Sequence, residues 1–210
     1  TDRAGGTTTY TYDSWGNLTS ETDADGHTIT STYDTVGRLT SRTDGNGNTT
    51  TFTYDAKGNL TVTTDPYGNT ASSTYNSMDR ITSSTNENGN KTTYEYDAMG
   101  RLTAATNAAG IRTEYVYDKN GNAVSMTDGN GNKTTYTYDA ENKLTKTVTP
   151  EGNTTELVYD AAGRMTKIIN ANGNEMGLSY DADGNATGMT DGNGYETAYE
   201  YDALGRISKQ

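Results

Sequence analysis

One spacing constrains this chain more than any other feature: a Tyr followed by Asp or Asn recurs every 21 residues without an insertion. The ten tyrosines are Tyr12, Tyr33, Tyr54, Tyr75, Tyr96, Tyr117, Tyr138, Tyr159, Tyr180 and Tyr201. A strict period of this kind is typical of tandem repeats, in which each unit buries its apolar face against its neighbours. Residues 1–210 are therefore interpreted as one array of ten repeats.

Composition without the repeat would indicate disorder, because only 30% of the residues are hydrophobic and the net charge is −12. Repetition predicts collective order instead, since neighbours of the same sequence can cover weakly apolar faces. The chain has no Cys, which excludes disulfides. Its acidity argues against nucleic acid as a partner, and no apolar run approaches the roughly 18 residues of a membrane span.

Two apolar columns accompany the tyrosines. Six residues after each Tyr lies a mostly aliphatic residue: Leu18, Leu39, Leu60, Ile81, Leu102, Ala123, Leu144, Met165, Ala186 and Ile207. Two residues before each Tyr lies a mostly bulky one: Tyr10, Ser31, Phe52, Ser73, Tyr94, Tyr115, Tyr136, Leu157, Leu178 and Tyr199. The residues between these columns are largely Thr, and alternation rich in Thr and Tyr predicts β-strands rather than helices.

Most repeats also carry two turn signals, in which an Asp or Asn is followed three residues later by Gly. Asp can accept a hydrogen bond from a following backbone N–H, and Gly accommodates a positive φ. The signals lie 10 and 11 residues apart, so each repeat is predicted to be a β-hairpin and ten repeats to give about twenty antiparallel strands. Examples are Asp13 with Gly16, Asp23 with Gly26, Asp55 with Gly58 and Asp97 with Gly100.

The odd period constrains how the strands pair. If both turns were three-residue loops, Tyr12 and Tyr33 would fall on opposite faces of the sheet. We therefore predict three loop residues, Ser14–Gly16, at the first turn and four, Ala24–His27, at the second. This assignment places Leu18 between Tyr12 and Tyr33 and aligns the tyrosines, with Leu18, Leu39, Leu60, Ile81, Leu102 and Leu144, as a structural core on one face.

The predicted fold is all-β: one continuous antiparallel sheet of tandem hairpins. Open twisted sheets of about twenty strands seldom stay open, so the ribbon should coil into a spiral shell or a hollow tube. The first two residues align with residues 22–23 and the last two with residues 20–21, so the chain begins and ends within the same strand. An array needs caps at its terminal edges, and the absence of caps leads us to expect a segment of a longer array.

The repeat resembles the YD repeat of the RHS family. Residues 54–61 read YDAKGNLT and residues 96–103 read YDAMGRLT, and the likeness covers the whole chain. The resemblance implies hairpins wound into a hollow β-shell around a C-terminal toxin domain in bacterial polymorphic toxins and insecticidal toxin complexes. Teneurins use a similar shell in cell adhesion. The chain departs from the full family pattern, because it shows no end plug, no self-cleaving core region and no variable toxin domain.

No residue pattern predicts a catalytic, cofactor-binding or metal-binding site, so we do not expect an enzyme. His27 is the only His, and it occupies a turn column that holds Asn48 in the next repeat. Equivalent carboxylates such as Asp13 and Asp34 should lie about 9 to 10 Å apart, too far to share one ion bound at roughly 2.3 to 2.6 Å. Residues 44–48 resemble the start of a calcium loop, but Thr49 stands where Gly is required.

Two functions remain. The first is a structural scaffold in a secreted or cell-surface protein, which encloses a toxin or builds an extended fibre; its partners are further copies of the repeat in cis or, in a fibre, other copies of the chain. The alternative is an extracellular adhesion or glycan-binding module in which Trp15, Tyr67 and Tyr195 stack on sugars or on a partner surface. The Asn-Xaa-Thr triplet of residues 17–19 matches a glycosylation acceptor but is interpreted as a recurring turn-to-strand junction.

Overall fold

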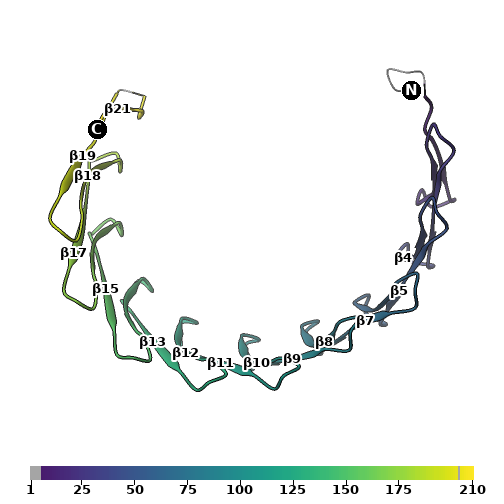
Figure 1. The fold of residues 1–210 in the computed structure, drawn as a ribbon, viewed down its shortest axis with the longest axis horizontal. Helices are drawn as coiled ribbons and strands as arrows, with labels where there is room; N and C mark the ends of the chain where they lie inside the picture. Colours follow the sequence, from purple (N-terminus) through teal and green to yellow (C-terminus); the bar gives the residue numbers. More distant parts are fainter. Residues whose placement is uncertain (1–5, 203) are drawn as a thin grey trace. The chain divides into compact units, whose positions relative to one another are not determined.

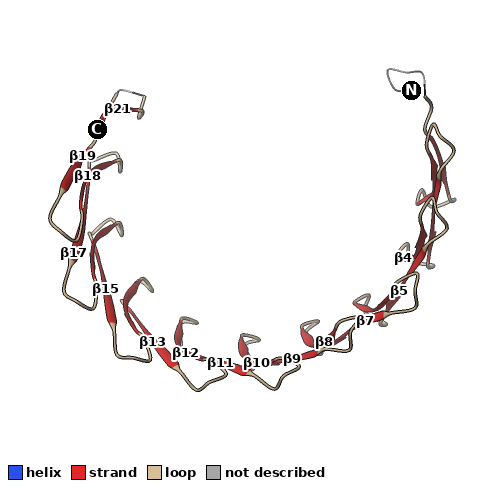
Figure 2. Cartoon of the chain, viewed as in Figure 1, coloured by secondary structure: helices blue, strands red, loops and turns tan. Residues whose placement is uncertain are grey.

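The computed structural model describes residues 6–202 and 204–210. All regular elements in these ranges are β-strands, and Figure 2 shows them joined by turns without a helix. The chain divides into two units, residues 1–110 and 111–210. The prediction of an all-β fold built from tandem hairpins is confirmed.

In the N-terminal unit, successive strands pair in chain order and always antiparallel. Figure 1 shows this unit as a single layer with turns along both edges. Its strands are β1 (Thr9–Tyr12), β2 (Leu18–Thr22), β3 (Thr28–Tyr33), β4 (Leu39–Thr43), β5 (Thr49–Tyr54), β6 (Leu60–Thr64), β7 (Thr70–Tyr75), β8 (Ile81–Thr85), β9 (Lys91–Tyr96) and β10 (Leu102–Thr106).

The C-terminal unit repeats this arrangement from β11 to β19, again with antiparallel neighbours. A short ladder of β20 and β21 follows. The strands are β11 (Arg112–Tyr117), β12 (Ala123–Thr127), β13 (Lys133–Tyr138), β14 (Leu144–Val148), β15 (Thr154–Tyr159), β16 (Met165–Ile169), β17 (Glu175–Tyr180), β18 (Ala186–Thr190), β19 (Glu196–Ala198), β20 (Glu200–Tyr201) and β21 (Ile207–Lys209).

Both turns of a repeat have the same three-residue loop. In the first turn, the backbone N–H of Asp13 donates to the carbonyl oxygen of Asn17 at 3.0 Å. In the second, the backbone N–H of Asp23 donates in the same way to His27 at 3.0 Å. Only residues 24–26 form that loop, because His27 already belongs to its closing pair. The predicted four-residue loop Ala24–His27 is therefore wrong.

A β-bulge in each repeat, and not a difference in loop length, keeps the repeated tyrosines on the same face. Tyr12 pairs with Leu18, but Thr11 pairs with Ser20, so Thr19 is an extra residue in its strand. Because side chains alternate between the two faces, one extra residue in a strand changes the face to which the later side chains point. With one such residue in each repeat, the tyrosines can recur every 21 residues and still point to the same face. The equivalent extra residues are Thr40, Thr61, Thr82, Thr103, Val124, Thr145, Thr166, Thr187 and Ser208.

The register places the repeated tyrosines of each unit on one face, which we call the tyrosine face. Tyr10 pairs with Glu21, and Glu21 pairs with Ile29. Because side chains alternate along a strand, Ile29 and Tyr33 point to the same side as Tyr10 and Tyr12. The opposite face carries mostly Thr and Ser in the N-terminal unit, and we call it the hydroxyl face.

The sheet has almost no fully buried core. Among the described residues, Ala104 is the only buried hydrophobic residue, at 1% exposure. The repeated tyrosines are half-buried, except Tyr12 in the outermost strand β1, which is 60% exposed. Leu60 and Ile81 are each 38% exposed. The residues expected to form a core therefore lie half-covered on one side of a single layer, and neighbouring repeats supply the cover they have.

Candidate interaction surfaces and the contacts between repeats

In most turns, an Asp at the first position caps the loop that follows it. One carboxylate oxygen of Asp13 accepts hydrogen bonds from the backbone N–H groups of Trp15 and Asn17, each at 2.9 Å. The other accepts from the Asn17 side-chain amide at 2.9 Å. Hydrogen bonds to the charged form favour it, so the Asn17 amide and the two backbone N–H groups lower the pKa of Asp13. The carboxylate columns are thus occupied in turn formation.

The hydroxyl of most repeated tyrosines reaches back to the preceding repeat. Tyr33 donates to the carbonyl oxygen of Leu18 at 2.9 Å, and Tyr54 donates to that of Leu39 at 2.9 Å. Leu18 therefore lies between Tyr12 and Tyr33 as expected, although its second contact is this hydrogen bond and not a cross-strand pair. The same bond joins Tyr75 to Leu60, Tyr96 to Ile81, Tyr138 to Ala123, Tyr159 to Leu144, Tyr180 to Met165 and Tyr201 to Ala186.

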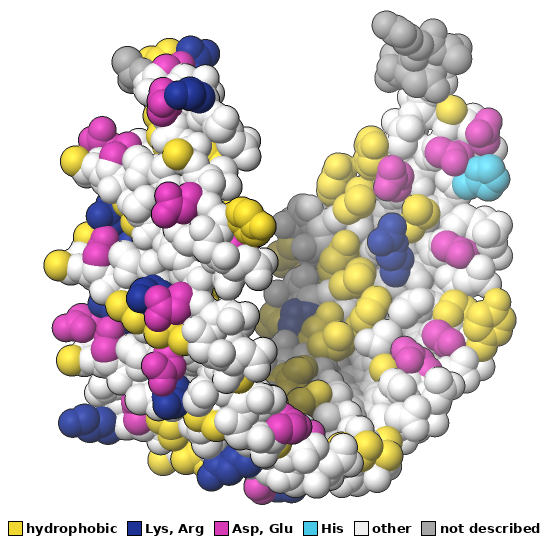
Figure 3. Space-filling model, turned by 60° about the vertical axis from the view of Figure 1, so that its left-hand side comes forward, with side chains coloured by type: hydrophobic (Ala, Val, Ile, Leu, Met, Phe, Trp, Pro, Cys, Tyr) yellow, Lys and Arg dark blue, Asp and Glu magenta, His cyan; other side chains and the backbone are white. Residues whose placement is uncertain are grey.

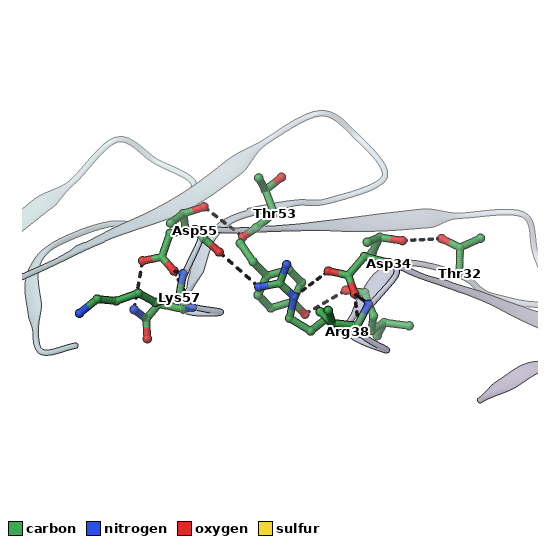
Figure 4. A network of polar contacts seen from close by, with 12 residues as sticks. Thr32, Asp34, Arg38, Thr53, Asp55 and Lys57 are labelled. Carbon is green, nitrogen blue, oxygen red and sulfur yellow. Dashed lines mark hydrogen bonds and ion pairs between the residues drawn. The ribbon is translucent and has the colours of Figure 1, made fainter. Parts of the chain in front are cut away.

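Arginine in the column after the turn glycine adds a second link between repeats. Arg38 binds the carboxylate of Asp34 in its own turn, with Nε 2.6 Å from Oδ2. Its guanidinium lies 4.8 Å from the centre of the Tyr54 ring, and Nη1 donates to the carbonyl oxygen of Asp55 at 3.2 Å. Figure 4 shows Arg38 between Asp34 and Asp55. One side chain thus holds two successive turns together.

The same link recurs elsewhere. Arg164 lies 4.8 Å from the centre of the Tyr180 ring and donates to the carbonyl oxygen of Asp181 at 2.9 Å. Arg80 and Lys143 lie over the tyrosines of the repeats that follow them, Tyr96 and Tyr159, at 5.8 and 5.6 Å. Sequence reasoning missed these contacts. The available signal was a column in which every residue is either Asn or a long cation.

Where that column holds Asn, a different contact forms. The Asn59 side-chain amide donates to Asp55 in its own turn at 3.0 Å and to Asp79 in the next turn at 2.9 Å. Asp79 stands where most repeats have Gly, and its φ is 60°. Asn142 is the second such residue, with φ 63°, and it accepts a hydrogen bond from Asn122 at 2.7 Å. A short Asn leaves room for a side chain at this position of the next repeat, whereas a Cβ at Gly100 would overlap the guanidinium of Arg80.

Hydrophobic side chains gather in a band on one face of the N-terminal unit (Figure 3). The tyrosine face of this unit carries a shallow hollow lined by Leu18, Glu21, Ile29, Ser31, Tyr33, Leu39 and Arg42, among others. The hollow lies where Ser31 replaces the bulky residue of the second column. Separately, Trp15, Tyr67 and Tyr195 are exposed at turns, at 79%, 87% and 75%. Trp15 lies in the first turn of its repeat, whereas Tyr67 and Tyr195 lie in second turns, and Tyr195 belongs to the other unit.

Asp23, Asp25 and His27 place one possible metal ligand atom each within 4.8 Å of one another. All three are exposed, and Nδ1 of His27 lies 3.1 Å from Oδ2 of Asp23. In the next repeat, the side-chain amide of Asn48 makes the equivalent contact with Asp44 at 2.9 Å. Turn formation accounts for this cluster, as the sequence predicted for His27.

Two family models match this chain and test its resemblance to the YD repeat. The Teneurin YD-shell model matches residues 65–210, and the RHS Repeat model matches residues 1–28 and 33–70. The chain belongs to the teneurin YD-shell family. The resemblance to RHS and YD repeats is thereby confirmed, and the hairpins described above are YD-shell repeats.

Solved structures show the same YD-shell fold. The Photorhabdus luminescens Tc holotoxin pore is 20% identical, with a TM-score of 0.61 over 86% of this chain and 12% of that chain. The TcdB2–TccC3–Cdc42 crystal structure is 15% identical, with a TM-score of 0.57 over 95% of this chain and 15% of that chain. This YD-shell chain therefore spans a small part of the length of either. No curated protein sequence matches it significantly. In the described ranges, no helix has the length and apolarity needed to cross a membrane.

Proposed function

We propose that this YD-shell chain is a structural wall segment of a secreted or cell-surface protein, in which a coiled array of hairpins encloses a toxin domain. One observation carries the proposal: the same tyrosine-to-carbonyl hydrogen bond joins one repeat to the next in both units. Because this contact recurs with the period, adding repeats extends the sheet without requiring a new kind of contact. A wall needs this property.

The distribution of polar groups supports a structural role over catalysis. A hydrolytic site needs a nucleophile, a base and an orienting group that converge in a pocket. Here the titratable groups of the turns repeat with the period, and the carboxylates bind their own loops, as Asp13 and Asp34 do. The proposal therefore assigns no catalytic residue and no cofactor.

The toxin-enclosing form is favoured over a fibre by the likeness of the fold to Tc toxin structures. The chain covers 12% and 15% of those chains, so the proposal includes further repeats in cis that complete the wall. Electron microscopy of the full expressed protein tests it. A closed shell with a protease-resistant interior supports toxin enclosure. Long tubes of uniform width would support the fibre, and extended particles without a wall would contradict both.

A second candidate function is adhesion through sugar stacking, and the exposed aromatic residues favour it. Trp15 is 79% exposed at a turn tip, where an aromatic ring can stack on an apolar sugar face. A glycan array probed with the natural chain and with Trp15→Ala tests this function. Binding that Trp15→Ala abolishes and Val36→Ala leaves unchanged would support it; equal binding by all three would exclude Trp15 as its basis.

A further inference from the structure

Two hollows in the N-terminal unit lie where a bulky side chain of the tyrosine face is replaced by a small one. In the column two residues before each Tyr, Ser31 and Ser73 alternate with Tyr10, Phe52 and Tyr94. The hollow described above lies at Ser31 and has a volume of about 240 Å³. A second hollow, of about 320 Å³, lies at Ser73. We call them the Ser31 hollow and the Ser73 hollow.

The two hollows are built from equivalent residues, two periods apart. Leu18 and Tyr33 line the Ser31 hollow, and their equivalents 42 positions later, Leu60 and Tyr75, line the Ser73 hollow. The similar lining means that the Ser73 hollow is an internal control for any property that depends on shape and apolar contact alone.

Charge distinguishes the two hollows. Glu21 and Arg42 both line the Ser31 hollow. The equivalent residues of the Ser73 hollow are Thr63 and Ser84. Three columns, those that contain Ile29, Ser31 and Arg42, form the centre of the tyrosine face, and between residues 6 and 110 their only charged members are Glu21 and Arg42. One negative and one positive side chain therefore meet at a single place on an otherwise uncharged surface.

The register keeps these two charges apart. Glu21 of β2 pairs with Ile29 of β3, and Arg42 of β4 pairs with Ser31 of β3. Strands β2 and β4 are thus separated by β3, a spacing of about 9 to 10 Å. Within the described residues, neither the Glu21 carboxylate nor the Arg42 guanidinium takes part in an ion pair or a hydrogen bond. Both charges face the same hollow without a partner.

Opposite charges elsewhere on the sheet are paired across neighbouring strands. Lys146 lies directly opposite Glu156 and forms an ion pair at 2.9 Å. Lys167 and Glu175, also on neighbouring strands, lie 2.6 Å apart. Glu21 and Arg42 differ from these pairs because a whole strand separates them, and the space between them is a hollow with an apolar lining.

A ligand that carries both charges fits this arrangement. Its ammonium group would bind the Glu21 carboxylate, its carboxylate would bind the Arg42 guanidinium, and its apolar part would lie against Leu18 and Tyr33. Ion pairs that are also hydrogen bonds are directional, so they fix the orientation of a ligand. We propose that the Ser31 hollow binds a small zwitterion with an apolar body, such as a free amino acid with a hydrophobic side chain.

The hollow also sets the strength of binding. It is shallow and smaller than the roughly 300 to 1,000 Å³ of ordinary ligand pockets, so the affinity should be low. Because both ion pairs are exposed, added salt should weaken binding. The site acts whether or not the wall encloses a toxin domain, so either proposal can fail without the other.

A titration followed by nuclear magnetic resonance tests the site, because this method detects weak binding and locates it. L-leucine should shift the backbone amide signals of Ser31 and Arg42 until they saturate, and leave those of Ser73 and Ser84 unchanged. L-leucinamide has no carboxylate and N-acetyl-L-leucine has no ammonium group. Each should bind about fivefold more weakly, the loss expected for one exposed ion pair.

Variants separate the roles of shape and charge. Ser31→Phe introduces the residue that Phe52 supplies in the next repeat, so it should fold, fill the hollow and abolish the shifts while both charges remain. Ser73→Phe is the matched control, and it should leave leucine binding unchanged. Glu21→Gln should bind L-leucine no better than N-acetyl-L-leucine. Arg42→Gln should bind L-leucine no better than L-leucinamide.

Four results would overturn the proposal. These are no saturable shift with L-leucine, equal affinity for an analogue with one charge, equal shifts at the Ser31 and Ser73 hollows, and unchanged binding by a folded Ser31→Phe variant. Equal shifts at both hollows would mean that leucine binds through apolar contact alone, without Glu21 and Arg42.

Discussion

The guanidinium of Arg38 lies 4.8 Å from the centre of the Tyr54 ring, in the next repeat, while its Nε is 2.6 Å from the carboxylate of Asp34 in its own turn. The Arg38 side chain therefore links two successive turns directly. Without it, these turns would be connected only through the hydrogen bonds between strands. Since the described residues form almost no buried core, we expect contacts of this kind to contribute a large share of the coupling between repeats.

Removing this link should weaken the array. Arg38→Ala should lower the free energy of unfolding by about 1 to 2 kcal/mol, because it loses one cation–π contact and two hydrogen bonds at a half-exposed site. Urea denaturation followed by circular dichroism measures the change. Arg42→Ala is the matched control, because Arg42 lies exposed on the tyrosine face at the hollow near Ser31 and should be close to neutral. Equal losses in the two variants would contradict the assigned role.

The tyrosine hydroxyls can be tested one atom at a time. Tyr54→Phe removes the 2.9 Å bond to the Leu39 carbonyl and should cost about 1 kcal/mol. Tyr12→Phe should be close to neutral, since the Tyr12 hydroxyl has no partner among the described residues. Chemical denaturation of both variants gives the comparison. A neutral Tyr54→Phe would show that the bond contributes nothing to stability.

Two glycines with similar backbone conformations should respond differently to alanine. Gly16 has φ 89° and Gly100 has φ 78°, so Ala at either position costs roughly 1 kcal/mol in backbone strain. A Cβ at Gly100 would also overlap the guanidinium of Arg80, which lies over Tyr96. Gly100→Ala should therefore be the more destabilising change in thermal unfolding.

The extra cost at Gly100 should vanish when its cause is removed. In the Arg80→Ala background, Gly100→Ala should destabilise no more than Gly16→Ala does in the natural chain. A double-mutant cycle of thermal stability measures this coupling. Additive effects would mean that Arg80 does not restrict the neighbouring turn.

The aspartate caps make stability depend on acid. Hydrogen bonds from Asn59 lower the pKa of Asp55, and the backbone N–H and guanidinium of Arg101 lower that of Asp97. Each folded pKa thus lies below the unfolded value of about 3.9, so the stabilisation is complete above that value and is lost as the pH falls through the lowered folded pKa. Melting temperature should be flat near neutral pH and fall below about pH 4.

A matched substitution separates the caps from other carboxylates. Asn76 caps its turn with the same two backbone hydrogen bonds, at 2.9 and 3.1 Å, and carries no titratable charge. Asp55→Asn should therefore keep the turn and make the acid loss shallower. Glu175→Gln, on an exposed ion pair with Lys167, should change the acid loss less. The reverse order would place the acid sensitivity outside the turns.

The sequence predicted the strands, the turns and the alignment of the tyrosines, because each depends on local patterns that repeat ten times. It did not predict how the odd period is accommodated. One extra residue in the strand, at Thr19, and one extra residue in the loop Ala24–His27 add the same number of residues to the repeat. One signal favoured the bulge: Asp13 to Asn17 and Asp23 to His27 share the spacing of Asp, Gly and the closing residue, and similar turns should adopt one geometry.

The contacts between repeats could not be predicted from single-repeat patterns. The Tyr33 hydroxyl bond to Leu18 and the Arg38 contact with Tyr54 connect residues 15 and 16 positions apart. Their distances depend on the bulge, which had not been assigned. The burial of the aliphatic column was also overestimated. Leu60 and Ile81 were expected to be covered, but each is 38% exposed.

Contacts between repeats, and not a core within one repeat, give this chain its order. The most direct measurement is the free energy of unfolding, by urea denaturation, of chains that contain increasing numbers of whole 21-residue repeats. A single repeat should be unfolded, and the free energy of unfolding should rise with each repeat added. An isolated repeat that folds, or a stability independent of repeat number, would contradict it.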